Sequence, residues 1–124
     1  KMAARKILIV DDSETMLQVA QMMLAKEPYD LVIARDGAEG VARALETNPD
    51  LILMDVMMPK MTGFEALRAL RSNDKTSAVP IVMITTKAEA ESIETGYASG
   101  CNEYIVKPVD SVELLAKVRS LLGD

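Results

Sequence analysis

The chain has 124 residues, of which 49% are hydrophobic, which suits one compact domain with a sizeable core. A formal net charge of −5 and few aromatic residues argue against direct binding of nucleic acid, which normally requires clustered Lys and Arg. A single cysteine and no histidine exclude an intrachain disulfide and a typical zinc site, and no apolar run reaches membrane-spanning length, so we expect a cytoplasmic protein without membrane insertion.

Five short apolar runs alternate with segments of helical period. They occupy residues 7–10, 31–34, 51–54, 81–84 and 104–106. Because they are nearly continuous in apolar residues, they predict strands of a parallel sheet that is covered on both faces. We therefore predict a single α/β domain over residues 1–124, with the doubly wound, flavodoxin-like architecture. It would have five parallel strands and five helices in a three-layer sandwich, and we take the strand order to be 2-1-3-4-5.

The predicted helices differ in how firmly they should pack. The first covers residues 13–26, with an expected inner face of Met16, Val19, Ala20, Met23 and Leu24. The last is capped by Asp110 with Glu113 three residues later, and its apolar stripe is Leu114, Leu115, Val118, Leu121 and Leu122. The helix at residues 88–99 has few apolar side chains and should be the most loosely held. The nine methionines are interpreted as core filler.

Side chains that can bind ions or take part in reactions follow four of the five predicted strands. Asp11 and Asp12 follow the first strand, Asp55 the third, Thr85 the fourth and Lys107 the fifth. The second strand ends in a turn at residues 35–37, to which we assign no chemistry. Ligands of open parallel sheets bind at the carboxyl ends of the strands, near the point where the strand order reverses. The sequence therefore predicts that these five side chains meet at one edge of the sheet.

Three carboxylates at one edge create an electrostatic conflict. Two like charges about 4 Å apart cost roughly 4 kcal/mol at an effective dielectric constant near 20, so the cluster should raise one pKa or bind a cation. Mg²⁺, with Mn²⁺ as an alternative, suits carboxylate and carbonyl oxygens. Asp55 could then act as a nucleophile toward phosphorus, with Lys107 and Thr85 contacting phosphoryl oxygens. Taken singly, each acid is as well explained as a helix cap or turn former; only the combination is specific.

Four segments together resemble the receiver domain of two-component response regulators, most obviously single-domain receivers of the chemotaxis type. They are ILIVDDS at residues 7–13, LILMDVMMPKMTG at residues 51–63, ITT at residues 84–86 and YIVKP at residues 104–108. The resemblance covers essentially the whole chain. It implies a signalling switch and not an enzyme in the usual sense, since such a domain catalyses only its own phosphotransfer and dephosphorylation.

The resemblance also implies roles for individual residues. Asp55 would take a phosphoryl group from a sensor histidine kinase or a phosphotransfer protein. Asp11, Asp12, Asp55 and the backbone carbonyl of Met57 would hold Mg²⁺, and Lys107, joined to Pro108 by a cis bond, would contact the phosphoryl group. Thr85 and Tyr104 would be the switch residues that alter the face of the fourth helix, fifth strand and fifth helix. Met57 and Lys87 would tune the phosphoryl lifetime.

The output expected from such a switch is control of an effector protein, by a monomer or a phosphorylation-dependent dimer. The main alternative is a receiver-like interaction module that is not phosphorylated, although no acid and no lysine of the site is missing. A dehalogenase-type phosphatase would need Asp-x-Asp after the first strand, where the chain has adjacent Asp11 and Asp12. A flavin-binding electron carrier would not place two carboxylates in its phosphate loop. No G-x-x-x-x-G-K-[ST] motif for a nucleoside triphosphatase is present.

Overall fold

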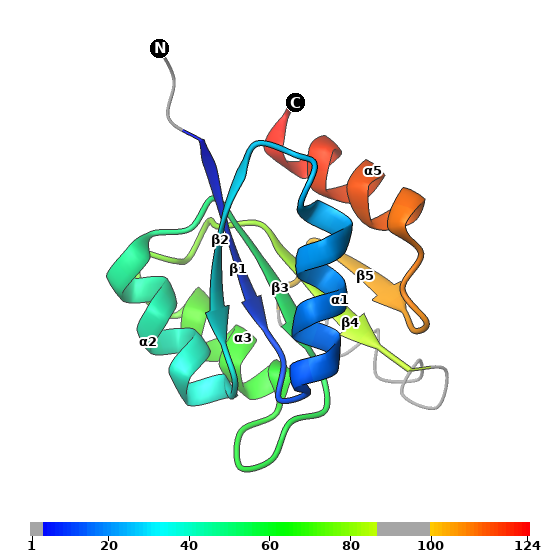
Figure 1. The fold of residues 1–124 in the computed structure, drawn as a ribbon. Coiled ribbons are helices and arrows are strands. Elements are labelled where there is room, and N and C mark those ends of the chain that lie inside the picture. The colour runs from blue at the N-terminus through cyan, green and yellow to red at the C-terminus, as the bar shows by residue number, and fades with distance from the viewer. Residues whose placement is uncertain (1–3, 87–99) are drawn as a thin grey trace.

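The computed structural model describes residues 4–86 and 100–124, and these form a parallel sheet between two layers of helices (Figure 1). The strands are β1 (Arg5–Val10), β2 (Tyr29–Ala34), β3 (Leu51–Asp55), β4 (Ile81–Thr85) and β5 (Glu103–Val106). The described helices are α1 (Glu14–Leu24), α2 (Gly37–Thr47), α3 (Gly63–Arg71) and α5 (Ser111–Leu122). The predicted helix at residues 88–99 lies outside the described residues, so the described part has four helices where five were predicted.

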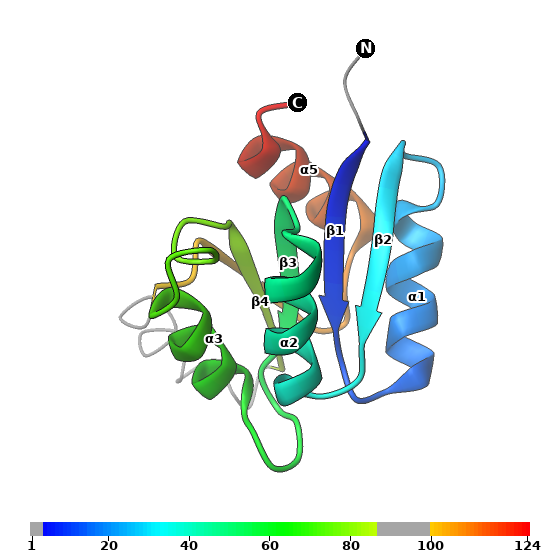
Figure 2. The ribbon, with the colours of Figure 1, turned by 90° about the vertical axis from the view of Figure 1, so that its left-hand side faces the viewer.

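The five strands follow the predicted order, β2-β1-β3-β4-β5, and every neighbouring pair is parallel. Helices α2 and α3 cover one face of the sheet, and α1 and α5 cover the other (Figure 2). A parallel sheet covered in this way is the doubly wound arrangement that the alternating apolar runs predict. The reversal of strand order lies between β1 and β3, which are adjacent in the sheet.

The core consists of two apolar clusters separated by the sheet. Alternate side chains of a strand point to opposite faces. In β1, Leu8 and Val10 accordingly pack with α2 and α3, whereas Ile7 and Ile9 pack with α1 and α5. All residues of β3 and β4 are buried, which explains why these strands are continuous apolar runs ended by a polar residue.

Each described helix begins at a side-chain cap just beyond a strand or loop. Ser13, Asp36, Thr62 and Asp110 accept a hydrogen bond from the backbone N–H three residues later. The cap of the last helix was predicted from Asp110 and Glu113 and is confirmed. Because each of these helices follows a strand of the parallel sheet, its capped N-terminus lies on the side of the carboxyl edge.

The buried stripe of α1 differs from the predicted one. Leu17, Ala20 and Leu24 are buried, whereas Met16, Val19 and Met23 are half-buried, and the helix is shorter at both ends than residues 13–26. Apolar residues occupy so many positions of this segment that two overlapping stripes have helical spacing. Packing between the sheet and α5 selects the stripe centred on Leu17.

The β3–α3 connection is held by backbone hydrogen bonds at both ends. Val56 donates its N–H to the carbonyl of Ile84 at 3.0 Å, and its own carbonyl accepts from the N–H of Gly63 at 2.8 Å. Gly63 lies so close to the strand end that a Cβ atom there would overlap the carbonyl oxygen of Asp55 and lie 2.9 Å from Cα of Val56. The glycine therefore allows α3 to start directly against the end of β3.

Among the described residues, no helix combines the length and the apolar character that crossing a membrane would demand.

We predict that Gly63→Ala destabilises the fold although alanine favours helices. The added methyl group meets rigid backbone, so the free energy of unfolding should fall by about 2 kcal/mol or more in urea denaturation. Gly37→Ala is a matched control at the first position of α2, where the methyl group meets the flexible side chain of Met61 at 3.0 Å and its carbonyl at 3.1 Å. The free energy of unfolding should fall by less than about 1 kcal/mol in this variant. Equal losses in both variants would contradict the conclusion that the backbone contact at Gly63 excludes a side chain.

Candidate functional site

Three carboxylates meet at the carboxyl edge of β1 and β3. Asp11, Asp12 and Asp55 each offer an oxygen within 4.8 Å of the others. The pairing of β1 with β3 produces this arrangement, because Val10 lies opposite Met54 and the acids follow directly. The predicted acidic cluster is therefore present in the structure.

Asp11 and Asp12 play different structural parts in the β1–α1 turn. Asp11 is buried, donates its backbone N–H to the carbonyl of Ala34 at 3.1 Å and accepts the N–H of Ser13 through Oδ1 at 2.9 Å. Burial raises the pKa of Asp11, an effect that the Ser13 N–H and the charge of Lys107 oppose. Asp12 is exposed at the mouth of the cluster. The turn thus presents one carboxylate fixed in the edge and one that faces solvent.

Asp55 carries the most strongly perturbed carboxylate of the cluster. Its side chain is 3% exposed, and Oδ1 lies 2.9 Å from Nζ of Lys107. This oxygen meets the Lys107 ammonium group, and no backbone N–H or hydroxyl group of the described residues donates to it. Burial raises the pKa of Asp55 to about 6; Lys107 lowers it, and the charges of Asp11 and Asp12 raise it further. The oxygen is thus positioned for a cationic or electrophilic partner.

Lys107 and Thr85 enter the site from the neighbouring strand ends. The backbone N–H of Lys107 donates to the carbonyl of Thr85 at 2.6 Å, and the Lys107–Pro108 bond is cis, as the resemblance implies. The Thr85 side chain is buried, and its hydroxyl donates to the carbonyl of Thr86 at 3.3 Å. Tyr104 is half-buried on β5 and packs against the α2–α3 side of the core. Lys87 lies outside the described residues.

Met57 was predicted to contribute a backbone carbonyl, and its side chain was grouped with the methionines of the core. The side chain is instead 60% exposed, and that of Met22 in the last turn of α1 is 76% exposed. The interpretation of all methionines as core filler is therefore wrong for these two. The sequence shows that methionine is apolar, but the backbone conformation decides whether its side chain points into the core or toward solvent.

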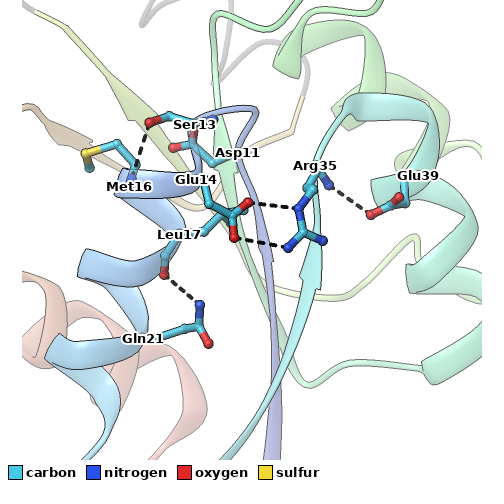
Figure 3. A network of polar contacts seen from close by, with 8 residues as sticks. All are labelled: Asp11, Ser13, Glu14, Met16, Leu17, Gln21, Arg35 and Glu39. Carbon is cyan, nitrogen blue, oxygen red and sulfur yellow. Dashed lines mark hydrogen bonds and ion pairs between the residues drawn. The ribbon is translucent and has the colours of Figure 1, made fainter.

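A polar network beside the cluster was missed from the sequence (Figure 3). The guanidinium of Arg35, at the end of β2, binds both carboxylate oxygens of Glu14 at 2.9 and 3.1 Å. The backbone N–H of Arg35 donates to Glu39 at 2.9 Å, and the hydrogen bond from Arg35 lowers the pKa of Glu14. The pair ties the first turn of α1 to β2. Arg35 directly follows the strand next to β1, and this position could have predicted a charged contact with the start of α1.

The donor set fits a hard divalent cation. Among the described residues the cluster offers three carboxylates and no cysteine or histidine ligand, and Oδ1 of Asp55 is buried without a backbone or hydroxyl donor. Mg²⁺ commonly binds one or two carboxylates with waters and phosphate oxygens. The described residues could therefore hold Mg²⁺ and leave ligand positions for a phosphoryl group.

Comparisons with known proteins agree with this fold. The model of the response regulator receiver domain matches residues 7–119. Protein PilH of Pseudomonas aeruginosa is 39% identical over 118 residues, which cover 95% of this chain and 98% of PilH. Other curated relatives are longer, and the chain spans about half of their length; several of these are described as DNA-binding regulators.

Solved structures show the same architecture. The chemotaxis protein CheY4 of Vibrio cholerae has a TM-score of 0.89 at 36% identity, covering 96% of this chain and 99% of CheY4. The receiver domain of the sensor histidine kinase PA1611 from Pseudomonas aeruginosa, described with a magnesium ion in its active-site cleft, has a TM-score of 0.90 at 30% identity. That match covers 98% of this chain and all of the other. The chain therefore belongs to the response regulator receiver domain family of two-component signalling systems.

Proposed function

We propose that this domain accepts a phosphoryl group on Asp55 in a Mg²⁺-dependent phosphorelay step. The observation that carries the proposal is the buried Oδ1 of Asp55, which faces Lys107 at 2.9 Å inside a cluster of three carboxylates. A structural acid would be expected to accept hydrogen bonds from a helix or turn. No backbone N–H of the described residues donates to this oxygen, which faces the Lys107 ammonium group instead, so it does not serve as a helix or turn cap.

The proposed reaction is a transfer between two protein side chains. An oxygen of the ionised Asp55 attacks the phosphorus of a phosphohistidine, the N–P bond breaks and an O–P bond forms, and the imidazole nitrogen leaves with the bond's electron pair. Lys107 offsets negative charge on the phosphoryl oxygens, because its ammonium group already lies beside the attacking carboxylate. The partner would be a sensor histidine kinase or a phosphotransfer protein, as the family membership supports.

Asp11, Asp12, Asp55 and the backbone carbonyl of Met57 would hold Mg²⁺, or Mn²⁺ in its place. When bound, the metal supplies positive charge that offsets the carboxylates and the transferred phosphoryl group. The magnesium ion named for the PA1611 receiver domain supports the same assignment here. Asp11 and Asp55 are held by the β1–α1 turn and the end of β3, so the site requires little rearrangement of the protein.

Phosphorylation would act as a switch through Thr85 and Tyr104. A phosphoryl group adds a charge of about −1.5 to −2 and strong acceptor oxygens, which favour movement of the Thr85 hydroxyl toward the site. Tyr104 would then occupy space behind Thr85, changing the face formed by β5, α5 and the helix predicted at residues 88–99. An effector protein would read this face, in a monomer or a phosphorylation-dependent dimer.

The second candidate function is a receiver-like module that binds partners without phosphorylation. The complete set of Asp11, Asp12, Asp55, Thr85 and Lys107 at one edge favours the phosphorylated switch. Under that proposal the domain catalyses only its own phosphotransfer and dephosphorylation, in the cytoplasm and within a single unit over residues 1–124.

Phosphoryl uptake tests the proposal directly. Incubation with Mg²⁺ and acetyl phosphate should add one phosphoryl group to the wild type and none to Asp55→Asn, as measured by intact-mass spectrometry. Asp50→Asn is the matched control, because Asp50 lies at the opposite end of the same strand and the new amide oxygen can still accept the Lys6 N–H. Equal labelling of all three proteins would refute Asp55 as acceptor, and no labelling of the wild type would favour the unphosphorylated module.

Mg²⁺ should stabilise the native state through the carboxylate cluster. A ligand at about ten times its dissociation constant contributes about 1.4 kcal/mol when it binds only the folded protein. The melting temperature of the wild type should therefore rise with Mg²⁺, and that of Asp12→Asn should rise much less. Asp30→Asn removes one exposed charge from β2 and should respond like the wild type. An identical response of Asp12→Asn and Asp30→Asn would place the metal elsewhere.

The raised pKa of Asp55 predicts how metal-free stability depends on pH. Its pKa rises on folding from 3.8 to about 6, so the native state binds the proton more tightly than the unfolded chain. Ionisation therefore destabilises the fold as pH increases from about 4 to about 6, by roughly 1–3 kcal/mol in total. Asp55→Asn should exceed the wild type in free energy of unfolding by this amount near pH 8 without metal. The difference in free energy of unfolding should vanish near pH 4. A difference that does not change with pH would contradict a raised pKa of Asp55 in the folded protein.

A further inference from the structure

Lys117 on α5 contacts both its own helix and the neighbouring strand. Its ammonium Nζ donates to the backbone carbonyl of Tyr104 at 2.7 Å and to the carboxylate of Glu113, four residues earlier, at 3.0 Å. It also lies 3.5 Å from the carboxylate of Glu103 and 5.4 Å from the centre of the Tyr104 ring. Oxygens of three residues thus surround the ammonium group, which matches the number of its N–H groups.

The ammonium group reaches Tyr104 at the outer edge of the sheet. β5 is the last strand in the order, and α5 packs beside it (Figure 1). The Tyr104 side chain packs against the α2–α3 side of the core, whereas α5 covers the opposite face. Lys117 therefore extends past the edge of β5 and connects α5 to the strand that carries Tyr104.

The surroundings of Lys117 favour its charged form. Burial lowers the pKa of Lys117, but the hydrogen bond and charge of Glu113, together with Glu103, outweigh burial, so the pKa is raised. A cation that lies over an aromatic ring within about 6 Å of its centre is attracted to the ring. Lys117 therefore attracts the Tyr104 ring toward its present position.

The contacts that hold the ammonium group do not depend on where the Tyr104 ring lies. The carbonyl of Tyr104 belongs to the main chain, and the two carboxylates belong to Glu103 and Glu113. A ring that turned away would leave the ammonium group in place and lose its attraction. The contact with Lys117 therefore favours the present ring position over positions farther from Nζ.

We propose that Lys117 is a positioning residue that holds the Tyr104 ring in its unphosphorylated position and thereby opposes phosphoryl uptake by Asp55. The effect on uptake rests on the proposed function, in which Tyr104 moves toward the space behind Thr85; the ring contact does not. An interaction made in only one of two states shifts their equilibrium, and the ring position and phosphorylation are coupled reciprocally. For one cation–ring contact at a partly exposed site, the shift is about two- to fivefold.

A purely structural role of Lys117 predicts a different result. Its pair with Glu113 has the spacing of an ordinary ion pair on a helix surface, which would stabilise only α5. Loss of that pair would lower the free energy of unfolding without speeding phosphorylation. Loss of a positive charge would by itself slow the reaction with an anionic phosphodonor. Faster uptake after removal of the Lys117 charge therefore indicates release of the ring.

Uptake from acetyl phosphate in the presence of Mg²⁺ is followed by intact-mass spectrometry. Lys117→Met removes the charge, Lys117→Gln removes the charge but can still donate to the Tyr104 carbonyl, and Lys117→Arg retains a cation. Arg119→Met is the matched control, because it removes one positive charge from the same helix at a residue that pairs with Glu27. Lys117→Met is also combined with Tyr104→Leu, which removes the ring.

We expect the initial rate of uptake to rise about two- to fivefold in Lys117→Met and Lys117→Gln. Lys117→Arg and Arg119→Met should match the wild type. In the Tyr104→Leu background, Lys117→Met should have no further effect, because that background has no ring to release.

A second measurement follows the ring without phosphorylation. Three-bond NMR couplings from the ring carbon Cγ of Tyr104 to its backbone nitrogen and carbonyl carbon report the populations of its χ1 rotamers, and they do not depend on nearby charge. In unphosphorylated Lys117→Met, a rotamer other than that of the wild type should gain about two- to fivefold in population. Lys117→Arg and Arg119→Met should keep the wild-type populations.

Unchanged χ1 populations in Lys117→Met would overturn the positioning role. Unchanged or slower uptake in Lys117→Met would overturn the effect on phosphorylation, as would the same acceleration in the Tyr104→Leu background. If the wild type takes up no phosphoryl group, the proposed function fails and the effect on uptake fails with it. The NMR couplings distinguish that failure, because they report the ring position independently of phosphorylation.

Discussion

The crowding of three carboxylates at the carboxyl edge of β1 and β3 is the constraint on which the site depends. Like charges this close are costly, and the cost grows because Asp55 is almost completely buried. Lys107, at 2.9 Å, compensates only part of it, since the pKa of Asp55 remains raised to about 6. The negative charge of the cluster is therefore only partly compensated, which favours binding of a further cation there.

Backbone hydrogen bonds hold the three mutually repelling carboxylates close together. The Asp11 N–H is bound to β2, Val56 is bound to β4 and to the start of α3, and Lys107 is bound to Thr85 through its own N–H. These hydrogen bonds hold the strand ends in place regardless of the charges that the side chains carry. A rigid edge of this kind keeps unfavourably placed charges together, because relaxation would require breaking buried backbone hydrogen bonds.

Side chains around this edge have more freedom than its backbone. Met57 projects from a fixed main chain, and the pair of Arg35 with Glu14 is solvent-exposed while it connects two elements. Such positions can vary or be modified without unpacking the core. Longer relatives, of which this chain spans about half, show that the same unit occurs within larger regulators. Exposed side chains around the carboxyl edge can therefore differ between relatives while the backbone of that edge stays the same.

The sequence by itself determined the parallel sheet, the gathering of the acids and the cap at Asp110. The sheet follows from strand-length apolar runs, the gathering of the acids from the rule that ligand sites lie at the carboxyl ends of parallel strands, and the cap from the spacing of Asp110 and Glu113. The strand order 2-1-3-4-5 was assumed at that stage, and the structure has it. Only the tertiary structure decided the buried stripe of α1, because apolar residues offer two faces of equal period and packing beside Leu17 selects one. It also decided the Arg35–Glu14 pair and the exposure of Met57, since both depend on how neighbouring elements meet in space and not on local pattern.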